Sequence, residues 1–315
     1  MNTYTTEIND WKEKGYTIVK NLFDKDVIKK CKSFLNEKFN DVNNSNNDFG
    51  SNGELEFPSG EIIDKITINE KLIQMVQKLL DSENILLVQS DTWSKSGEIN
   101  NNSQSNKNQR MHMDYGNNTF LHPSKWDNPE AVAAIIYFSD TKKTGGGTAV
   151  VPKNGKQDEL YKFPYINMPG QNQYPFFNNK KFAEEYFKNN HKDIYNFRQK
   201  LYNREIIPEY STGDVLFYRL DVWHRGTPVL INKIRNVMNL LWKKKECYWI
   251  NTWNPGWTKK MYYGILEKMF EEMSPLQRSL FGVPLPGDKY WTLENIYVLK
   301  QRYLNIDITP YLSKL

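Results

Sequence analysis

The sequence has few of the features that define several common protein classes. Only two cysteines occur in 315 residues, Cys31 and Cys247, which excludes a disulfide framework and is typical of a reducing compartment. No segment is long and apolar enough to span a membrane, and the N-terminal residues lack the apolar stretch of a signal peptide. The composition therefore predicts a soluble intracellular protein.

The chain also has little excess charge. Its net charge is +5 at pH 7, and the basic residues are spread along the chain except for a short run at residues 243–245. Such a run is typical of a solvated strand end, with contact to an acidic substrate as the alternative. Without a basic stripe or a recognised motif, nothing indicates nucleic-acid binding. With 39% hydrophobic and 14% aromatic residues, the chain can bury the core of one large domain.

Histidine is scarce too, yet two of the four histidines fall in a pattern. His112 precedes Asp114 by two positions, and His224 lies 110 positions beyond Asp114. Because alternate residues of a strand point to the same side, His112 and Asp114 can chelate one metal while Met113 points away. Two histidines and one carboxylate form the face that leaves three positions open on non-heme Fe(II). For any single histidine, the alternative is a packed or surface side chain.

An arginine follows the second histidine by eleven positions. Residues 213–224 predict a turn, a short apolar strand and a second turn that brings His224 to the metal. The alternating segment 234–242 predicts the next antiparallel strand, with Arg235 at its start. The planar, permanently charged group of Arg235 suits one carboxylate held by two hydrogen bonds. The sequence therefore predicts an acidic cosubstrate beside the metal.

This ordered set of residues resembles the phytanoyl-CoA dioxygenase family of Fe(II)/2-oxoglutarate-dependent oxygenases. Residues 15–22 and 26–35 resemble the family's opening strand and helix, and residues 145–152 resemble the strand before its mid-barrel turn. The resemblance implies a mainly β fold with flanking helices, in which a double-stranded β-helix forms a jelly-roll, cupin-like barrel. It implies that His112, Asp114 and His224 bind Fe(II). It also implies that Arg235 pairs with the distal carboxylate of 2-oxoglutarate.

The chain departs from the family after the mid-barrel strand, where Pro-Lys-Asn-Gly at residues 152–155 replaces the Pro-Gly-Ser-His of many members. This loop therefore predicts nothing about substrate contacts. Two further residues are candidate 2-oxoglutarate contacts, Gln89 on a predicted strand at residues 85–95 and Thr148. For each of them, the alternative is a polar strand position without a role.

The resemblance also implies a reaction. Related halogenases carry a small residue in place of the carboxylate, so Asp114 favours hydroxylation. The expected enzyme uses Fe(II), 2-oxoglutarate and O2 to hydroxylate a C–H bond of a small organic substrate, for example an acyl compound. It releases succinate and CO2. Desaturation and cyclisation start from the same chemistry. Outside oxygenases, the alternatives are a metal-dependent hydrolase on a similar barrel and an inactive binding module.

The organisation predicted along the chain is a single domain over residues 1–315. Residues 1–80 are expected to be helical support, residues 81–250 the barrel core with an insertion near 155–205, and residues 251–315 a helical cap. The clearest helical patterns span 71–80 and 260–270. Asn-rich tracts at 41–52 and 100–109 predict loops, the second of which is a lid or a tolerated expansion beside His112. Aromatic residues within 161–202 are expected either to line a substrate site or to pack on the barrel.

Two segments near the C-terminus bear on the location and assembly of the protein. The last three residues, Ser313-Lys314-Leu315, match the peroxisomal import tripeptide, which is read at a free C-terminus in eukaryotes. We therefore expect a cytoplasmic protein, or a peroxisomal one if the source is eukaryotic. The amphipathic segment 260–270 is compatible with a monomer or with burial in a homodimer.

Overall fold

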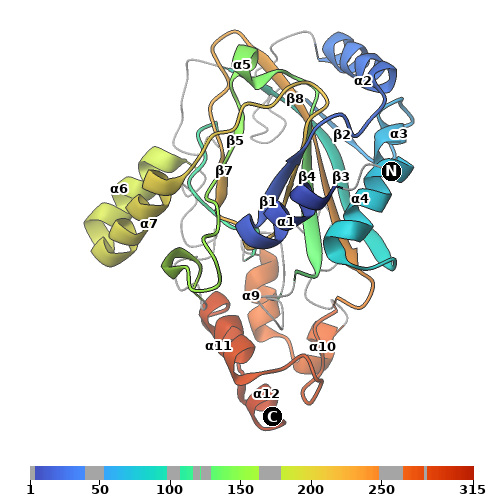
Figure 1. Cartoon of the computed structure of the whole chain (residues 1–315). Coiled ribbons are helices and arrows are strands. Elements are labelled where there is room, and N and C mark those ends of the chain that lie inside the picture. Colours follow the sequence, from blue (N-terminus) through green and yellow to red (C-terminus); the bar gives the residue numbers. More distant parts are fainter. Residues whose placement is uncertain are drawn as a thin grey trace.

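The computed structural model describes residues 4–39, 53–97, 107–115, 121, 129–162, 179–247, 265–279 and 282–315. Its centre is a six-stranded antiparallel sheet in the order β1-β6-β4-β8-β3-β2 (Figure 1). These strands are β1 (Tyr16–Val19), β2 (Gly53–Glu56), β3 (Ile85–Ser96), β4 (Ala131–Tyr137), β6 (Val215–Tyr218) and β8 (Ile234–Lys244). A second, smaller sheet pairs β5 (Thr148–Val150) with β7 (His224–Gly226). Two antiparallel sheets with flanking helices agree with the predicted jelly roll.

Helices from the first 80 residues cover one face of the large sheet. They are α1 (Thr5–Lys14), α2 (Lys25–Lys38), α3 (Asp64–Thr67) and α4 (Glu70–Leu80). Helix α4 begins where the Asn69 side chain accepts hydrogen bonds from the next turn and ends at Asp81 in a left-handed conformation. Its apolar stripe packs against alternate residues of β4, including Val132 and Ile136. Burying each large aliphatic side chain contributes about 1.5 to 3 kcal/mol, which holds the helices on the sheet.

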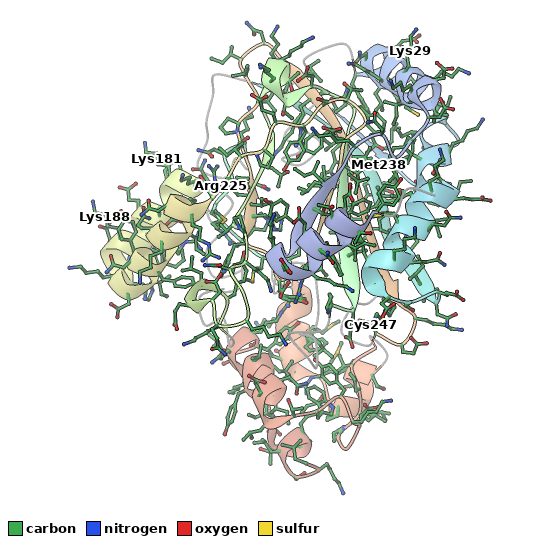
Figure 2. The ribbon with its side chains drawn as sticks, in the orientation of Figure 1. Lys29, Lys181, Lys188, Arg225, Met238 and Cys247 are labelled. Atoms are coloured by element: carbon green, nitrogen blue, oxygen red, sulfur yellow. The ribbon has the colours of Figure 1, made fainter. Side chains whose placement is uncertain are left out.

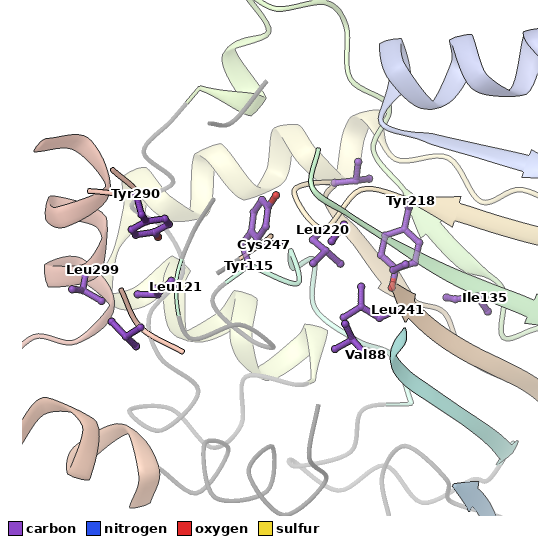
Figure 3. Packing of buried hydrophobic residues seen from close by; sticks show 14 of the residues in the cluster. Val88, Tyr115, Leu121, Ile135, Tyr218, Leu220, Leu241, Cys247, Tyr290 and Leu299 are labelled. Carbon is purple, nitrogen blue, oxygen red and sulfur yellow. The ribbon is translucent and has the colours of Figure 1, made fainter. Parts of the chain in front are cut away.

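The other residues of the same strands form a second core on the opposite face. Ala133 and Tyr137 of β4 point there, together with Tyr218 of β6 and Leu241 of β8. Figure 3 shows Tyr218 and Leu241 close to each other and to Val88 of β3. All seven residues of β4 are buried, because both faces of this strand are covered.

The C-terminal helices extend this second core beyond the end of the sheet (Figure 1). They are α9 (Ile265–Glu272), α10 (Pro275–Ser279), α11 (Leu293–Arg302) and α12 (Thr309–Leu312). Of the amphipathic segment predicted at 260–270, residues 260–264 lie outside the described residues. Both cysteines are buried, and neither forms a disulfide bond within the described residues. No helix in the described part of the chain is long and apolar enough to cross a membrane.

The region predicted as an insertion contains a helical hairpin. Helices α6 (Lys180–Asn190) and α7 (Lys192–Arg204) lie beside the small sheet, after the short helices α5 (Thr141–Thr144) and η1 (Glu159–Tyr161) (Figure 1). The hairpin was not predicted because its helices bury few apolar side chains, among them Phe187 and Leu201. The aromatic residues at 163–178, the tract 41–52 and residues 100–106 of the second tract lie outside the described residues.

Candidate metal centre

The two histidines of the pattern meet through their backbones. The N–H of His112 donates to the carbonyl of His224 at 2.9 Å, and the N–H of His224 donates to the carbonyl of His112 at 2.8 Å. This antiparallel bridge adds the segment around His112 to the small sheet, next to β7. The centres of the two imidazole rings lie 4.4 Å apart. Residues far apart in sequence are thus held as directly opposed partners.

Asp114 completes the group of three. Its backbone N–H donates to the carbonyl of Leu220 at 3.1 Å, and its Oδ1 lies 3.7 Å from Nε2 of His224. One ligand atom from each of the three residues lies within 4.8 Å of the others. Met113 points away, as predicted, into a separate buried cluster with Trp223. Asp114 lies in a bend after the bridge, so the bond to Leu220, and not strand alternation alone, directs its carboxylate.

Backbone carbonyls orient both imidazole rings. Nδ1 of His112 lies 3.0 Å from the carbonyl oxygen of Arg110, and Nδ1 of His224 lies 2.9 Å from that of Val222. A carbonyl oxygen can only accept, so each Nδ1 carries the hydrogen and each Nε2 keeps its lone pair. This is the arrangement by which proteins prepare histidine for a metal. The donor set therefore fits a divalent cation such as Fe(II).

Burial sets the protonation of these groups. It lowers the pKa of His112 well below the usual value, and the nearby His224 lowers it further. It raises the pKa of Asp114, while Tyr218 opposes this rise by donating a hydrogen bond to the carboxylate. The ring of Tyr218 also lies 4.6 Å from that of His224. His112 is thus neutral and able to bind a cation, and a cation bound beside Asp114 would oppose the rise of its pKa.

Arg235 is a buried cation that no described carboxylate balances. Its Nη1 donates to the carbonyl of Gly146 at 3.0 Å, whereas its Nε has no hydrogen-bond partner among the described residues. A side chain at position 146 would meet Arg235 Cδ at 2.9 Å, so glycine is needed for this approach. Burial lowers the pKa of Arg235, which means that an anion beside it would be favourable. The site fits a bound carboxylate.

A second basic residue accompanies Arg235, and sequence reasoning missed it. Lys95 of β3 lies directly opposite Arg235 in the register with β8, and it is buried. Directly opposed residues of antiparallel strands point to the same side. The side chains of Lys95 and Arg235 therefore lie next to each other on one face of the sheet. No local pattern around Lys95 reveals this, because the register depends on strands 140 positions apart.

The two other candidate cosubstrate residues have partners within the protein. Thr148 Oγ1 accepts a hydrogen bond from the Tyr137 hydroxyl at 2.8 Å, and the Thr148 N–H donates to the same hydroxyl at 3.0 Å. Tyr137 is close enough to Arg235 that the guanidinium opposes the rise of its pKa. Gln89 Nε2 donates to Asp91 Oδ2 at 2.8 Å on β3. A cosubstrate role for Thr148 and for Gln89 stays a prediction.

Fold and site together define a jelly-roll protein with two histidines and one carboxylate at a candidate metal centre. The sequence matches the phytanoyl-CoA dioxygenase (PhyH) family over residues 11–237, and the chain belongs to this family. The resemblance read from the motifs is thereby confirmed. No curated protein sequence matches the chain.

Solved structures support the fold. The non-heme alpha ketoglutarate dependent carbocyclase SnoK from nogalamycin biosynthesis has a TM-score of 0.56 and 11% identity, with 91% of this chain and 95% of that chain covered. EvdO2 from Micromonospora carbonacea var. aurantiaca, complexed with 2-oxoglutarate, has a TM-score of 0.52 and 9% identity over 79% and 94% of the two chains. EctD from S. alaskensis, with 2-oxoglutarate and 5-hydroxyectoine, has a TM-score of 0.51 and 12% identity over 78% of each chain. At these identities the similarity shows the fold, and the predicted jelly roll is confirmed.

Proposed function

We propose that this protein is an Fe(II)/2-oxoglutarate-dependent oxygenase that hydroxylates a C–H bond of a small organic substrate. The observation that carries the proposal is the pairing of two features. Ligand atoms of His112, Asp114 and His224 gather within 4.8 Å of one another, and the buried guanidinium of Arg235 has an unpaired Nε among the described residues. Membership of the phytanoyl-CoA dioxygenase family supports the same reading.

Each residue then has a role that its contacts support. His112, Asp114 and His224 would hold Fe(II), and Arg235 with Lys95 would bind the distal carboxylate of 2-oxoglutarate. When bound, Fe(II) and 2-oxoglutarate would activate O2 for oxidation of the substrate, and 2-oxoglutarate would be converted to succinate and CO2. Tyr218 holds the carboxylate of Asp114 through a hydrogen bond. Burial of Asp114 and His224 would limit the access of bulk water to the reacting groups.

Thr148 would contribute through Tyr137. The hydroxyl of Tyr137 is held between the backbone N–H and the side chain of Thr148, close to Arg235. Its closeness to Arg235 supports a contact between the Tyr137 hydroxyl and the distal carboxylate of 2-oxoglutarate. Gln89 lies opposite Leu241 in the β3–β8 register, on the sheet face that also carries Arg235. We propose it as a contact of the cosubstrate or the substrate.

Hydroxylation is preferred because a carboxylate stands at the third ligand position, which halogenases leave free for halide. Cyclisation is the second candidate, because SnoK, with 95% of its length covered, is a carbocyclase. Both reactions begin with removal of hydrogen from carbon, and they differ in the bond that follows. The substrate is a small molecule in either case.

The proposal is tested by anaerobic titration of the metal-free protein with Fe(II) and then 2-oxoglutarate. We expect a visible charge-transfer band that His224→Ala abolishes and Arg235→Ala weakens. Succinate release would then guide a screen for the substrate. Absence of the band in the unaltered protein would overturn the oxygenase proposal and favour a hydrolytic metal site or a binding module.

A further inference from the structure

The extended segment that carries His112 has a second edge, which bridges to Asn179 at Gln109 but which no described strand covers at Met111. Gln109 and His112 form backbone hydrogen bonds toward Gly226 and His224 of β7. Because successive residues of a strand direct their N–H and C=O groups to opposite sides, those of Met111 face away from β7. A buried backbone group without a partner is costly, so this edge needs another partner.

Side chains of α7 supply that partner. The N–H of Met111 donates to the Tyr202 hydroxyl at 3.0 Å, and Arg198 Nη2 donates to the carbonyl of Met111 at 3.0 Å. Both backbone groups of the residue before His112 are therefore held by one helix. Met111 is fully buried, and Arg198 is only 1% exposed, so water does not compete for these bonds.

Glu184 of α6 fixes the two α7 side chains. Its Oε1 accepts from Arg198 Nε at 2.8 Å and from the Tyr202 hydroxyl at 2.8 Å. The Tyr202 hydroxyl thus donates to Glu184 and accepts from Met111, which leaves it one defined orientation. Charge-assisted bonds of this kind are short and directional. The trio Glu184, Arg198 and Tyr202 forms one connected network.

The strand that carries His224 is held by the end of the same hairpin. Arg225 binds both carboxylate oxygens of Glu205, the residue that follows α7, at 2.7 and 2.8 Å. Its Nη1 donates to Asn108 Oδ1 at 2.8 Å, which links it to the strand of His112. Figure 2 shows Arg225 where the α6–α7 hairpin meets the small sheet.

Apolar side chains also join α7 to the residues next to His112 and His224. Leu201 of α7 lies in one buried cluster with Met111 and Met113, which flank His112, and with Trp223, which precedes His224. The hairpin therefore touches the residues beside both histidines. It touches neither imidazole ring in the described contacts.

From these contacts we propose that the α6–α7 hairpin is a positioning device for the metal centre. The Glu184, Arg198 and Tyr202 network sets the backbone position of His112, and the Glu205–Arg225 pair sets that of His224. These are positioning residues, because they act on the ligands through the backbone. The proposal rests on the proposed function only in taking the three ligand residues to bind a metal.

The test compares Tyr202→Phe with Tyr195→Phe on the same helix. Tyr202→Phe keeps the ring and removes the hydroxyl that holds Met111. Tyr195 is the matched control, because its hydroxyl has no hydrogen bond among the described residues. Cobalt(II) is the probe, since its visible spectrum reports the geometry of the ligands without O2 chemistry. Melting of each metal-free protein is measured in parallel.

We expect Tyr202→Phe to bind cobalt(II) about 10-fold or more weakly and to shift its visible bands, as the loss of a group supporting a ligand does. Tyr195→Phe should bind as the unaltered protein does. An unchanged affinity and spectrum in Tyr202→Phe would overturn the positioning role, even if its melting temperature falls. If the unaltered protein binds no cobalt(II), the proposed function fails instead, so the two failures are distinguishable.

Hydrogen exchange of the unaltered metal-free protein covers the case in which Tyr202→Phe does not fold. The amide of Met111 should exchange slowly, because Tyr202 already holds it before metal binds. Exchange as fast as in an exposed loop would show that the hairpin does not position this strand, and would overturn the proposal.

Discussion

The candidate metal centre and the surroundings of Arg235 lie in the same jelly roll but are built in opposite ways. At the centre, the supporting polar groups are paired: carbonyls hold each Nδ1, and Arg198 and Tyr202 hold Met111. By contrast, the buried Nε of Arg235 has no partner within the described residues. Ligands of a metal must be oriented before it binds, whereas a pocket for an anion must keep donors free for it. The paired groups thus hold the candidate metal ligands in position, whereas the unpaired Nε of Arg235 is left to bind an anion.

The largest expected effect comes from breaking the metal side of this comparison. His224→Ala removes a ligand and one ring of the bridged pair, so metal affinity should fall by more than the about 10- to 100-fold seen when only a supporting group is lost. Anaerobic Fe(II) titration measures this. His191→Ala, on an exposed residue between α6 and α7, is the control and should bind normally. Equal binding by His224→Ala would contradict the ligand assignment.

The next largest effect is expected at Arg235. Arg235→Met removes charge-assisted hydrogen bonds to a carboxylate, so 2-oxoglutarate should bind about 10- to 100-fold more weakly. Fe(II) affinity should change little, since Arg235 contacts none of the three ligand residues in the described hydrogen bonds. Calorimetric titration of both ligands separates the two effects. A parallel loss of Fe(II) affinity would show that the two regions are not independent.

Asp91 extends the comparison to an acidic group on the same face as Arg235. It lies opposite Asn239 on β8, no described cation pairs with it, and burial raises its pKa to about 6. The folded state therefore keeps the Asp91 proton to higher pH than the unfolded state, and this contribution to the free energy of unfolding falls as pH rises from about 4 to about 6.

Asp91→Asn should remove the destabilisation that ionised Asp91 causes. The free energy of unfolding should therefore rise by about 2 to 3 kcal/mol at pH 8, but by less at pH 5. Denaturant unfolding at the two pH values measures the difference. Glu83→Gln, on an exposed residue, serves as the control. The gain in stability of Asp91→Asn over the unaltered protein should be larger at pH 8 than at pH 5. An equal or smaller gain at pH 8 would contradict a buried Asp91 carboxylate without a balancing charge.

The smallest expected effect concerns Thr148. Thr148→Val keeps the shape and removes the acceptor for the Tyr137 hydroxyl, while the backbone N–H of residue 148 still donates to it. The loss of one buried hydrogen bond should cost about 1 kcal/mol of stability, as measured by thermal unfolding. If 2-oxoglutarate affinity also falls, the proposed cosubstrate role of Thr148 is supported. If only stability falls, Thr148 belongs to the support side of the comparison.

Much of the fold was predictable because it has a local signal. The patterns at 71–80 and 234–242 are confirmed as α4 and β8, since one face of each is largely apolar at the period of its secondary structure, and the strand expected at 85–95 is confirmed as β3. The helices α6 and α7 were missed, because polar residues dominate them, and besides each other they contact a distant segment, at Met111. The candidate metal ligands could be proposed from the sequence because the spacing of His112 and Asp114 is itself local, and the structure brings their ligand atoms and that of His224 within 4.8 Å of one another.

The sequence by itself determined the donor groups: two histidines, one carboxylate and one arginine, in an order that resembles a family. Tertiary structure alone decided what surrounds them. Lys95 faces Arg235 only through the β3–β8 register, and Tyr202 reaches Met111 across 91 positions of sequence. The physical reason is that periodicity encodes which side of a strand or helix is apolar. It does not encode which distant backbone group a polar side chain will satisfy once the elements pack.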